Sequence, residues 1–552
     1  MYTTSEDRIG KWVGEGFWGD KTLCDHLALQ ARVCSGRLAV IDPSNRMDFT
    51  GGDALRLTYG QLDAASDAMA LDLMDAGLRH GQRVMLQMPN VVELVVCYFA
   101  LSKLGVIVSP LPVQYQAHEI TTLSRAFRTE WFIGFADFRG VNLASNGVAA
   151  VASDRIITVG SDIRLRSLTG LSKGDAARLA AYRVTHPTDV NAIFTVCWTS
   201  GTTGTPKGVP RSHNMWLSSG QATASGIGFR AGDVLLNPFP MVNMSALGGF
   251  LFPATTMGCT LVLHHPLDVP VFLQQIQQEG VCFTIAPPAL LNRLAKMPEL
   301  WRRFDFPNLR AIGSGSAPLS PDMIRTFEVD YGVSVYNIYG SNEGIAFITS
   351  PDVVPDPAQR AVMFPHSNTD SVDPSSTKPS LMTKVIEPDS GTELETSGAI
   401  GELCVLGPTV FDGYLGSEDL SVFTPDGFFR TGDLVEITGE GGELYRIVGR
   451  LKDIINRGGM KISPAELDSL LEGYPGIVEV AVCAFNDEEL GERVGACVVM
   501  QEGAVEPTLT ELCRFLQDKG VAKFKWPERL RVVSALPRNP LGKVLRHELS
   551  VQ

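Results

Sequence analysis

The chain has 552 residues, which corresponds to about three to four domains of typical length. An apolar share of 44% and a charged share of 20% are ordinary for a packed globular protein, and they exclude collagen-like, coiled-coil and low-complexity classes. Acidic residues outnumber basic ones by 61 to 47, and the resulting formal charge of −14 is a poor match to nucleic acid, which binds a broad cationic surface.

The first hundred residues carry no targeting or membrane signal. Residues 1–12 mix charges of both signs with glycine, so we expect no export. The most apolar stretch, residues 91–110, contains Glu93 and Lys103, whereas a membrane span needs roughly 20 nearly uncharged residues. We predict a buried helix followed by a strand there, and no membrane span. Ten cysteines without a Cys-x-x-Cys pair favour a reducing, cytoplasmic setting.

Strand-like and helical segments alternate from about residue 55 onward. Strands are predicted at 55–59, 83–88 and 106–111, with one helix capped by Thr58 and Gln61 and another over 90–104. A second series has strands at 192–198, 233–238, 259–264, 281–286, 309–315 and 333–340, and helices at 271–280 and 289–297. The alternation predicts parallel sheets with right-handed crossovers, and hence two sheet-bearing subdomains.

The pattern changes after residue 350. Residues 352–378 are rich in Pro, Asp and Ser, which predicts a long surface connection. Strand-like sequence resumes at 401–407. Beyond Gly449, a helix begins at 463–466, and strands at 478–485, 496–500 and 529–536 accompany a helix over 509–520. We therefore predict an α/β fold with a large N-terminal domain of layered α/β subdomains (1–449) and a small mobile α+β C-terminal domain (450–552).

The segment TSGTTGTPKG, residues 199–208, follows a predicted buried strand. Its glycines, hydroxyl side chains and Lys207 offer backbone N–H groups, O–H donors and a cation to an anion such as a triphosphate. Pro206 stands where a Walker A motif has glycine, so the loop is of another kind. Taken alone, the segment could equally be a flexible surface turn.

Five further segments occur in an order typical of one family. They are GSGSAPL (313–319), YGSNEG (339–344), FRTGDL (429–434), YRIVGRLKDIINRGGMKISPAE (445–466) and NPLGKVLR (539–546). With these segments and the 199–208 loop, the chain resembles the acyl-adenylate-forming superfamily, which includes acyl-CoA synthetases, aryl-acid AMP ligases and luciferases. Each motif alone is weak, but six in this order make the resemblance specific.

The resemblance implies a site for ATP built from these motifs. The residues that it places at the nucleotide are Thr199, Ser200, Gly201, Thr202, Thr203, Gly204, Lys207, Gly315, Ser316, Ala317, Asn337, Tyr339, Gly340, Asn342, Asp433 and Arg450. Tyr339 would stack on adenine, and Glu343 would be a catalytic residue that holds Mg²⁺, because oxygen ligands suit that hard ion. Asn342 stands where the family commonly has threonine, and its amide could still donate to a phosphate oxygen.

The C-terminal motifs also receive roles by resemblance. Asp433 would accept hydrogen bonds from the ribose hydroxyls. Lys543 would be catalytic, because attack of a carboxylate on the α-phosphate of ATP brings two anions together. Lys452 would be the hinge about which the small domain rotates, and Gly458 and Gly459 would let coenzyme A pass close to the backbone. On residue chemistry alone, Asp433 could be an Asx-turn residue and the two glycines a plain turn.

The acid pocket is expected along residues 237–249 and in two of the glycine-containing motifs. Its expected lining is Asn243, Met244, Gly313, Ser314 and Ser341. Aryl-acid AMP ligases for hydroxybenzoates usually have His-Asn where this chain has Asn243-Met244. Because methionine is an apolar wall that directs no hydrogen bond to a ring hydroxyl, we expect a compact apolar acid, aromatic or alicyclic.

The resemblance therefore implies an ATP- and Mg²⁺-dependent acid:CoA ligase, with a small carboxylic acid and coenzyme A as its partners. A stand-alone aryl-acid AMP ligase that loads a carrier protein is the main alternative. An oxidative enzyme of the luciferase type and a catalytically inactive nucleotide-binding regulator are further ones. The presence of Glu343, Asp433 and Lys543 argues against the regulator, and no sequence feature indicates oxygen chemistry.

We predict that Lys543→Ala lowers the rate of acyl-adenylate formation about 100-fold or more, because the lysine acts only where phosphoryl charge develops. Thioester formation from supplied acyl-adenylate should be largely spared. Pyrophosphate release and single-turnover transfer to coenzyme A measure the two half-reactions separately. Equal losses in both would contradict the assigned role.

Overall fold

The computed structural model describes residues 4–165, 170–199, 206–315, 319–366, 381–439, 441–458, 460–487, 489–538, 544–549 and 551. The chain forms two compact units. The first consists of Met1–Ala361, Ser375–Met382 and Leu406–Val422, and the second of Val362–Pro374, Thr383–Val405 and Phe423–Gln552. The expected boundary after Gly449 falls inside the second unit, and a division of the chain at that residue remains a prediction.

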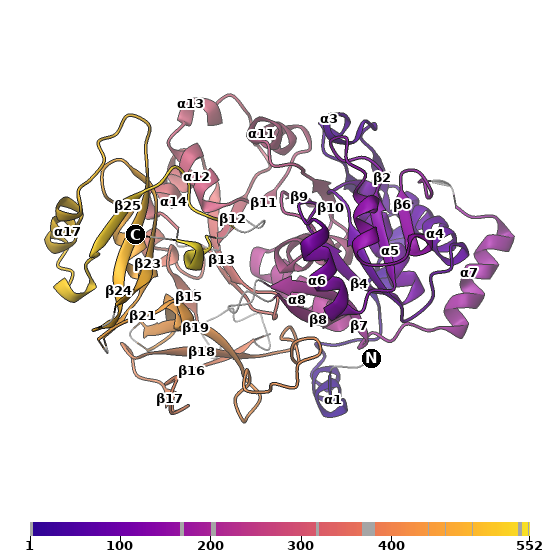
Figure 1. The fold of residues 1–552 in the computed structure, drawn as a ribbon. Helices are drawn as coiled ribbons and strands as arrows, with labels where there is room; N and C mark the ends of the chain where they lie inside the picture. The colour runs from indigo at the N-terminus through magenta and orange to yellow at the C-terminus, as the bar shows by residue number, and fades with distance from the viewer. Residues whose placement is uncertain are drawn as a thin grey trace. The chain divides into compact units, whose positions relative to one another are not determined.

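An eight-stranded sheet forms one part of the first unit (Figure 1). In spatial order its strands are β14 (Ala346–Thr349), β13 (Ser334–Gly340), β12 (Ala311–Gly315), β11 (Phe283–Ile285), β9 (Val234–Asn237), β10 (Thr260–Leu263), β1 (Leu38–Ile41) and β2 (Arg56–Thr58). The strands between β13 and β1 pair in parallel, whereas β14 and β2 are antiparallel edges. Five of the six strands predicted for the second series lie in this sheet and pair in parallel, as the helices between them require. The grouping is wrong at two strands, because the predicted strand at 192–198 belongs to the other sheet of this unit and the predicted strand at 55–59 is β2 of this one.

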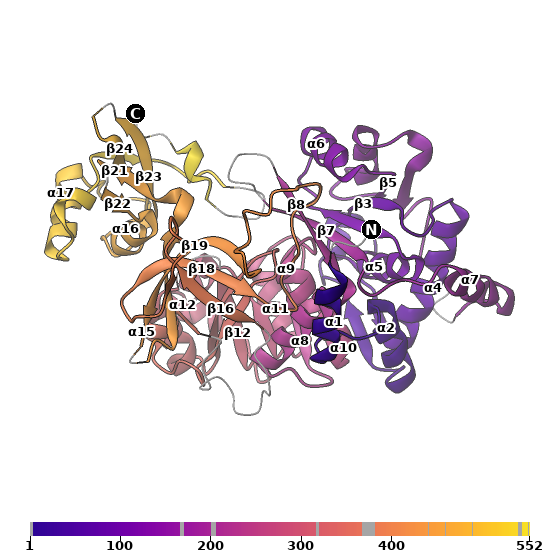
Figure 2. The same ribbon diagram turned by 90° about the horizontal axis from the view of Figure 1, so that it is seen from below.

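A six-stranded sheet forms the other part of the first unit (Figures 1 and 2). Its order is β6 (Ile156–Val159), β5 (Trp131–Phe135), β3 (Arg83–Gln87), β4 (Ile107–Leu111), β7 (Ile193–Thr199) and β8 (Lys207–Ser212). All pairs are parallel except β7 and β8, which run antiparallel on either side of the predicted phosphate loop. The two predicted sheet-bearing subdomains are therefore present.

Helices connect these strands. They are α1 (Glu6–Gly14), α2 (Leu23–Val33), α3 (Arg46–Thr50), α4 (Tyr59–Asp75), α5 (Val92–Leu104), α6 (Ala117–Phe127), α7 (Lys173–Thr185), α8 (His213–Ile227), α9 (Met244–Ala246), α10 (Phe252–Met257), α11 (Val269–Gln278), α12 (Pro288–Ala295), α13 (Pro298–Trp301), α14 (Pro321–Arg325) and α15 (Pro357–Arg360). Thr58 and Gln61 form the predicted capping box of α4.

Helix α5 is buried along its whole length, as predicted. Its Glu93 pairs with Arg46, and its Lys103 pairs with Asp63 and Asp67, so both buried charges have partners within the protein. None of the described helices is long and apolar enough to cross a membrane.

The second unit contains two smaller sheets. One has the order β15 (Met363–Pro365), β20 (Leu444–Arg450), β19 (Phe429–Thr438), β18 (Ile400–Leu406), β16 (Met382–Ile386) and β17 (Glu393–Leu394). The other consists of β22 (Met460–Ile462), β21 (Ile455–Arg457), β24 (Gly491–Met500), β23 (Ile477–Asp487) and β25 (Arg529–Val532), accompanied by α16 (Pro464–Leu471) and α17 (Leu509–Asp518). The predicted α+β character of the C-terminal residues is confirmed.

The prediction of a plain surface connection over residues 352–378 is wrong for its first part. Residues up to 366 include α15 and β15, and Arg360 is fully buried. The Arg360 guanidinium donates to the carbonyl oxygens of Val354 and Pro355, at 2.5 and 2.9 Å, and it pairs with Glu328. One arginine thus orders a segment whose Pro and Asp content is typical of loops.

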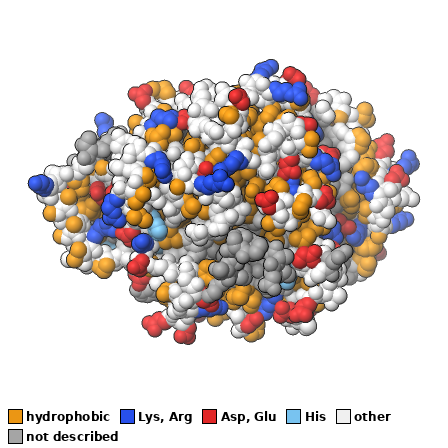
Figure 3. Space-filling view, turned by 180° about the vertical axis from the view of Figure 1, so that it is seen from behind, with side chains coloured by type: hydrophobic (Ala, Val, Ile, Leu, Met, Phe, Trp, Pro, Cys, Tyr) orange, Lys and Arg blue, Asp and Glu red, His pale blue; other side chains and the backbone are white. Residues whose placement is uncertain are grey.

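Charged side chains are mixed on the surface. On the face shown in Figure 3, Lys and Arg are interspersed with Asp and Glu, so the described residues form no broad cationic surface there. This distribution agrees with the net charge of −14 and with the expectation that nucleic acid is not a partner.

Candidate functional site

The turn that carries Glu343 follows β13. The Gly344 N–H donates to the Ser341 carbonyl oxygen at 3.1 Å. Gly344 has a φ of 112°, and a Cβ there would lie 2.0 Å from the Thr409 carbonyl oxygen, so only glycine fits. Glu343 is 9% exposed. A carboxylate buried to this degree needs polar partners.

Residues 407–415, called here the 407–415 loop, supply those partners. The Phe411 N–H donates to the Glu343 carbonyl oxygen at 2.8 Å, and the Thr409 hydroxyl donates to the Gly344 carbonyl oxygen at 2.7 Å. The Tyr414 hydroxyl donates to Oε1 of Glu343 at 2.9 Å. No described residue donates to Oε2, so this oxygen is the one that could bind a cation.

Tyr414 also connects Glu343 to the predicted phosphate loop. The Nζ of Lys207 lies 4.6 Å from the centroid of the Tyr414 ring, within the range of a cation–π interaction. Lys207 begins β8, where it pairs with Thr199 at the end of β7. The next residue, Gly208, accepts a hydrogen bond from the Leu415 N–H at 2.9 Å. One tyrosine therefore contacts both a carboxylate and a cation. The sequence offered little to identify it, since it is one of two aromatic residues in a glycine-containing loop.

The Asn342 amide is used within the protein. Its Nδ2 donates to the Trp198 carbonyl oxygen at 3.3 Å, and its Oδ1 accepts from the Met244 N–H at 2.9 Å. A single side chain thus links the strand before the phosphate loop to the predicted acid-pocket segment. The expected contact with a phosphate oxygen remains a prediction, and it would use the second N–H of Nδ2.

Arg211 on β8 was missed by the sequence reasoning. It is fully buried, and burial lowers the pKa of its guanidinium to about 10, so that it remains a cation at neutral pH. Its Nη1 donates to the Asn342 carbonyl oxygen at 3.0 Å, and its Nη2 donates to the Met215 carbonyl oxygen and the Ser219 hydroxyl, at 3.1 and 2.7 Å. Arg211 therefore holds the Glu343 turn against the first turns of α8.

Two residues expected at the nucleotide lie on β13. The Tyr339 ring stacks on Phe347 with centroids 5.9 Å apart. The Nδ2 of Asn337 donates to the carbonyl oxygens of Arg360 and Ala361, at 2.8 and 3.0 Å. The Asn337 amide nitrogen thus holds the backbone that precedes β15. Only its side-chain oxygen remains to bind a ligand.

The glycine and serine positions around β12 and β13 differ in their surroundings. A Cβ on Gly315 would lie 1.8 Å from a backbone oxygen of β13, whereas Gly340 is exposed at the end of that strand. The Ser314 hydroxyl donates to the Ala286 carbonyl oxygen at 2.8 Å. In contrast, the hydroxyl oxygen of Ser341 is buried and has no described hydrogen-bond partner, so a ligand could satisfy it.

The expected acid-pocket segment begins a helix. Asn243 caps it, with Oδ1 accepting from the Ala246 N–H at 3.3 Å. Met244 is 8% exposed, and its sulfur occupies the space beside Gly248, where a Cβ would lie 2.5 Å from Sδ and 3.4 Å from the Trp216 ring. Met244 therefore packs next to an aromatic wall, as the apolar interpretation of this position requires.

The second unit contains the remaining expected site residues. Asp433 and Arg450 face each other on β19 and β20, with two hydrogen bonds of 2.5 and 3.3 Å between guanidinium and carboxylate. Asp433 is 4% exposed. Lys452 is exposed directly after β20, and Gly458 has a φ of 56° at the turn between β21 and β22. The other expected residues, Ser200, Gly201, Thr202, Thr203, Gly204, Ser316, Ala317, Gly459 and Lys543, lie outside the described residues.

Glu343 fits a Mg²⁺ that arrives with a nucleotide. Within the described ranges no group of three or more His, Cys, Asp or Glu side chains could hold a metal ion. Such a group is not needed, because Mg²⁺ at nucleotide sites takes most of its ligands from phosphates and water, and one or two from carboxylates.

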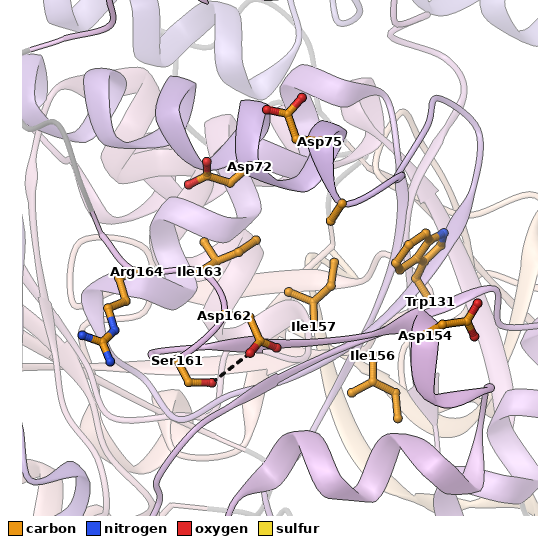
Figure 4. Close-up of a pocket in the computed structure, with 11 residues that line it drawn as sticks. Asp72, Asp75, Trp131, Asp154, Ile156, Ile157, Ser161, Asp162, Ile163 and Arg164 are labelled. Atoms are coloured by element: carbon orange, nitrogen blue, oxygen red, sulfur yellow. Dashed lines mark hydrogen bonds between the residues drawn. The ribbon is translucent and has the colours of Figure 1, made fainter.

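A separate cavity of about 500 Å³ lies near the end of α4 and β6 (Figure 4). Its lining includes Asp72, Asp75, Asp154, Asp162 and Trp131. Its four carboxylates outnumber its one cation, Arg164, so the lining is acidic and disfavours a polyphosphate or an organic acid, and none of these residues was expected at the site. This cavity is therefore distinct from the candidate site.

Comparison with known proteins identifies the family. The AMP-binding enzyme family matches residues 27–415, and the AMP-binding enzyme C-terminal domain matches residues 466–543. Pyochelin synthase PchD from Pseudomonas aeruginosa strain UCBPP-PA14 is 31% identical, over 98% of this chain and 94% of its own. The 2-hydroxy-7-methoxy-5-methyl-1-naphthoate–CoA ligase from Streptomyces carzinostaticus is 28% identical, over 98% and 94%.

A solved structure with the same fold contains ATP. The crystal structure of ATP-bound MatB from Rhodopseudomonas palustris superposes with a TM-score of 0.75 at 27% identity, covering 96% of this chain and 98% of that one. The chain therefore belongs to the AMP-binding enzyme family and is an adenylate-forming ligase of ATP and a carboxylic acid, either an acid:CoA ligase or an aryl-acid AMP ligase.

Proposed function

We propose that this protein is an ATP- and Mg²⁺-dependent acid:CoA ligase for a compact cyclic acid, aromatic or alicyclic. It would form an acyl-adenylate with release of pyrophosphate, and then an acyl-CoA thioester with release of AMP. The observation that carries the proposal is the contact of both Glu343 and Lys207 with Tyr414. A carboxylate and an amine held side by side suit a metal–triphosphate, whose metal binds the carboxylate and whose phosphates bind the amine.

Different residues of this chain would bind the metal, bind the phosphates and stabilise the transition state of adenylation. When bound, Mg²⁺ supplies positive charge to the phosphates, and Glu343 would hold it through Oε2 while Tyr414 fixes Oε1. Lys207 and the backbone of the 199–208 loop would bind the phosphates. Lys543 would offset the charge that gathers at the α-phosphate as the acid attacks.

We predict that Tyr414→Phe raises the Mg²⁺ concentration for half-maximal adenylation roughly tenfold, because it removes a hydrogen bond to a charged group while keeping the ring beside Lys207. Pyrophosphate release measured across a Mg²⁺ series tests it. Tyr474→Phe, which removes a hydroxyl from the second unit, is the matched control. An unchanged Mg²⁺ requirement in Tyr414→Phe would show that the hydroxyl does not act on a metal ligand.

Thioester formation would depend on the second unit. The exposed position of Lys452 directly after β20 supports a hinge there, and the left-handed backbone of Gly458 supports a tight turn past which a pantetheine arm could run.

We predict that Lys452→Pro leaves adenylation nearly intact but lowers acyl transfer to coenzyme A about 10-fold or more, because proline fixes φ at a position that must rotate. Lys452→Ala removes the same amine without that restriction and serves as the control. Pyrophosphate release and thioester yield are measured in parallel. Normal complete turnover by the proline variant would rule out a hinge at this residue.

The surroundings of the expected pocket support a cyclic apolar acid. Besides Met244 and Trp216, the side chains of Ile285 and Ile338 lie close to Gly313. Each buried CH₂ contributes about 0.8 kcal/mol, and a ring loses less conformational entropy on binding than a flexible chain. The naphthoate–CoA ligase among the relatives is named for a cyclic acid and for coenzyme A as acceptor, which agrees with both parts of the proposal.

We predict a higher kcat/KM for benzoate-like or cyclohexanecarboxylate-like acids than for acetate, long-chain fatty acids, dicarboxylates or 2,3-dihydroxybenzoate. A second carboxylate would be buried without a partner, which is costly. A kinetic panel of these acids, run with coenzyme A and with a phosphopantetheinylated carrier protein as acceptor, measures both preferences. Preference for acetate, a long chain or the dihydroxy acid would contradict the pocket assignment, and transfer only to the carrier would favour the aryl-acid AMP ligase alternative.

A further inference from the structure

Residues 4–18 lie outside the matched family range, which begins at residue 27, yet two of their large side chains are buried. Trp12 and Trp18 are 2% and 3% exposed, and both cluster with Met215 of α8. Figure 2 draws α1 next to α8, the helix that carries Met215. The segment is therefore part of the first unit's packed structure.

This N-terminal segment, defined as residues 4–18, forms hydrogen bonds and an ion pair with one side of the 407–415 loop. Nη2 of Arg8 donates to the carbonyl oxygens of Val410 and Gly407, at 2.7 and 3.1 Å, and its Nη1 pairs with Asp412 at 2.5 Å. The Trp18 indole N–H donates to the Pro408 carbonyl oxygen at 3.1 Å. The Thr4 hydroxyl also bonds to Asp412.

The other side of the same loop holds the Glu343 turn. The N-terminal segment contacts residues 407, 408, 410 and 412, whereas Thr409, Phe411 and Tyr414 hydrogen-bond to Glu343 and Gly344. The loop is thus held between the N-terminal segment and the turn. A displacement on the Arg8 side must move the donors on the Glu343 side.

Electrostatics make Arg8 the critical residue of this contact. The side chains of Arg8 and Asp412 are 17% and 9% exposed. Burial raises the pKa of the Asp412 carboxyl, and the Arg8 charge opposes that rise. Without Arg8 the carboxylate would be buried with too little compensation, so the loop would have to move to expose it or bind a proton.

We propose that Arg8 is a positioning residue that sets the metal-binding geometry of Glu343 through the 407–415 loop. The inference rests on the proposed role of Glu343 as a Mg²⁺ ligand. It assigns to a segment outside the family match a function in the adenylation step, beyond its contribution to stability.

The test compares half-saturating Mg²⁺ for pyrophosphate release in the full chain carrying Arg8→Ala, Arg8→Lys or Glu343→Gln. Arg32→Ala, at an exposed arginine of α2, is the matched control. We expect Arg8→Ala to raise the Mg²⁺ requirement about fivefold, and Arg8→Lys to raise it less, since lysine keeps the charge but not the fork of donors. Thioester formation from supplied acyl-adenylate should be unchanged, which a merely unstable protein would not show.

A double variant separates action through the loop from a general loss of structure. In a Tyr414→Phe background, Arg8→Ala should add little to the Mg²⁺ requirement, because the hydrogen bond from the loop to the Glu343 carboxylate is already absent. An unchanged Mg²⁺ requirement in Arg8→Ala, full additivity with Tyr414→Phe, or equal losses in both half-reactions would overturn the inference. If Glu343→Gln itself leaves the Mg²⁺ requirement unchanged, the proposed role of Glu343 fails instead. Should Arg8→Ala not fold, Arg8→Lys carries the same comparison.

Discussion

Burial of the Glu343 carboxylate is the constraint on which the candidate site depends. A carboxylate that is 9% exposed needs donors or a cation, because an unpaired buried charge is costly. Tyr414 provides a donor from 71 residues further along the chain. Tyr414 can donate this bond only if the 407–415 loop keeps its position. Hydrogen bonds from the loop to Gly208 and Gly344, and from Arg8 to the loop, hold it in place.

Two fully buried arginines order segments that have no regular structure of their own. Arg211 donates to carbonyl oxygens at the Glu343 turn and in α8, and Arg360 does so to the chain that precedes β15. A guanidinium has five N–H donors in a rigid plane, so it can satisfy several carbonyl groups that no strand or helix partners. Each arginine thereby satisfies several backbone carbonyl groups, although the Nε of Arg211 is buried without a described partner.

Asn342 joins the two substrate regions. Its amide bonds to the strand before the phosphate loop and to the first residue of the acid-pocket helix. The donor and the acceptor of the amide lie in one rigid plane, so they cannot move independently. A shift of one region therefore changes the hydrogen bond to the other. The regions expected to bind the acid and the phosphates therefore share a structural element, placed next to the carboxylate proposed to hold the metal.

The sequence by itself located most of the strands of the first unit, the helices α4, α5, α11 and α12, the capping of α4 and the family motifs, but it missed β1, β5, β6, β8 and β14. These features are local: they depend on side-chain periodicity, capping residues and short spacings. The assignment of Glu343, Lys207 and Asp433 to the site also came from the sequence, and it stays a prediction. The tertiary structure alone decided which residues support them. The supporting residues Tyr414, Arg211, Arg8 and Asp412 act through contacts between residues as much as 408 positions apart, and such contacts leave no periodic pattern in the sequence. Contacts distant in sequence also explain Arg360, whose burial accompanies ordered structure in a segment of loop-like composition.

Only the folded chain shows that the amides of Asn337 and Asn342 already have partners within the protein. A sequence shows which donors a residue carries, but not which of them are already hydrogen-bonded.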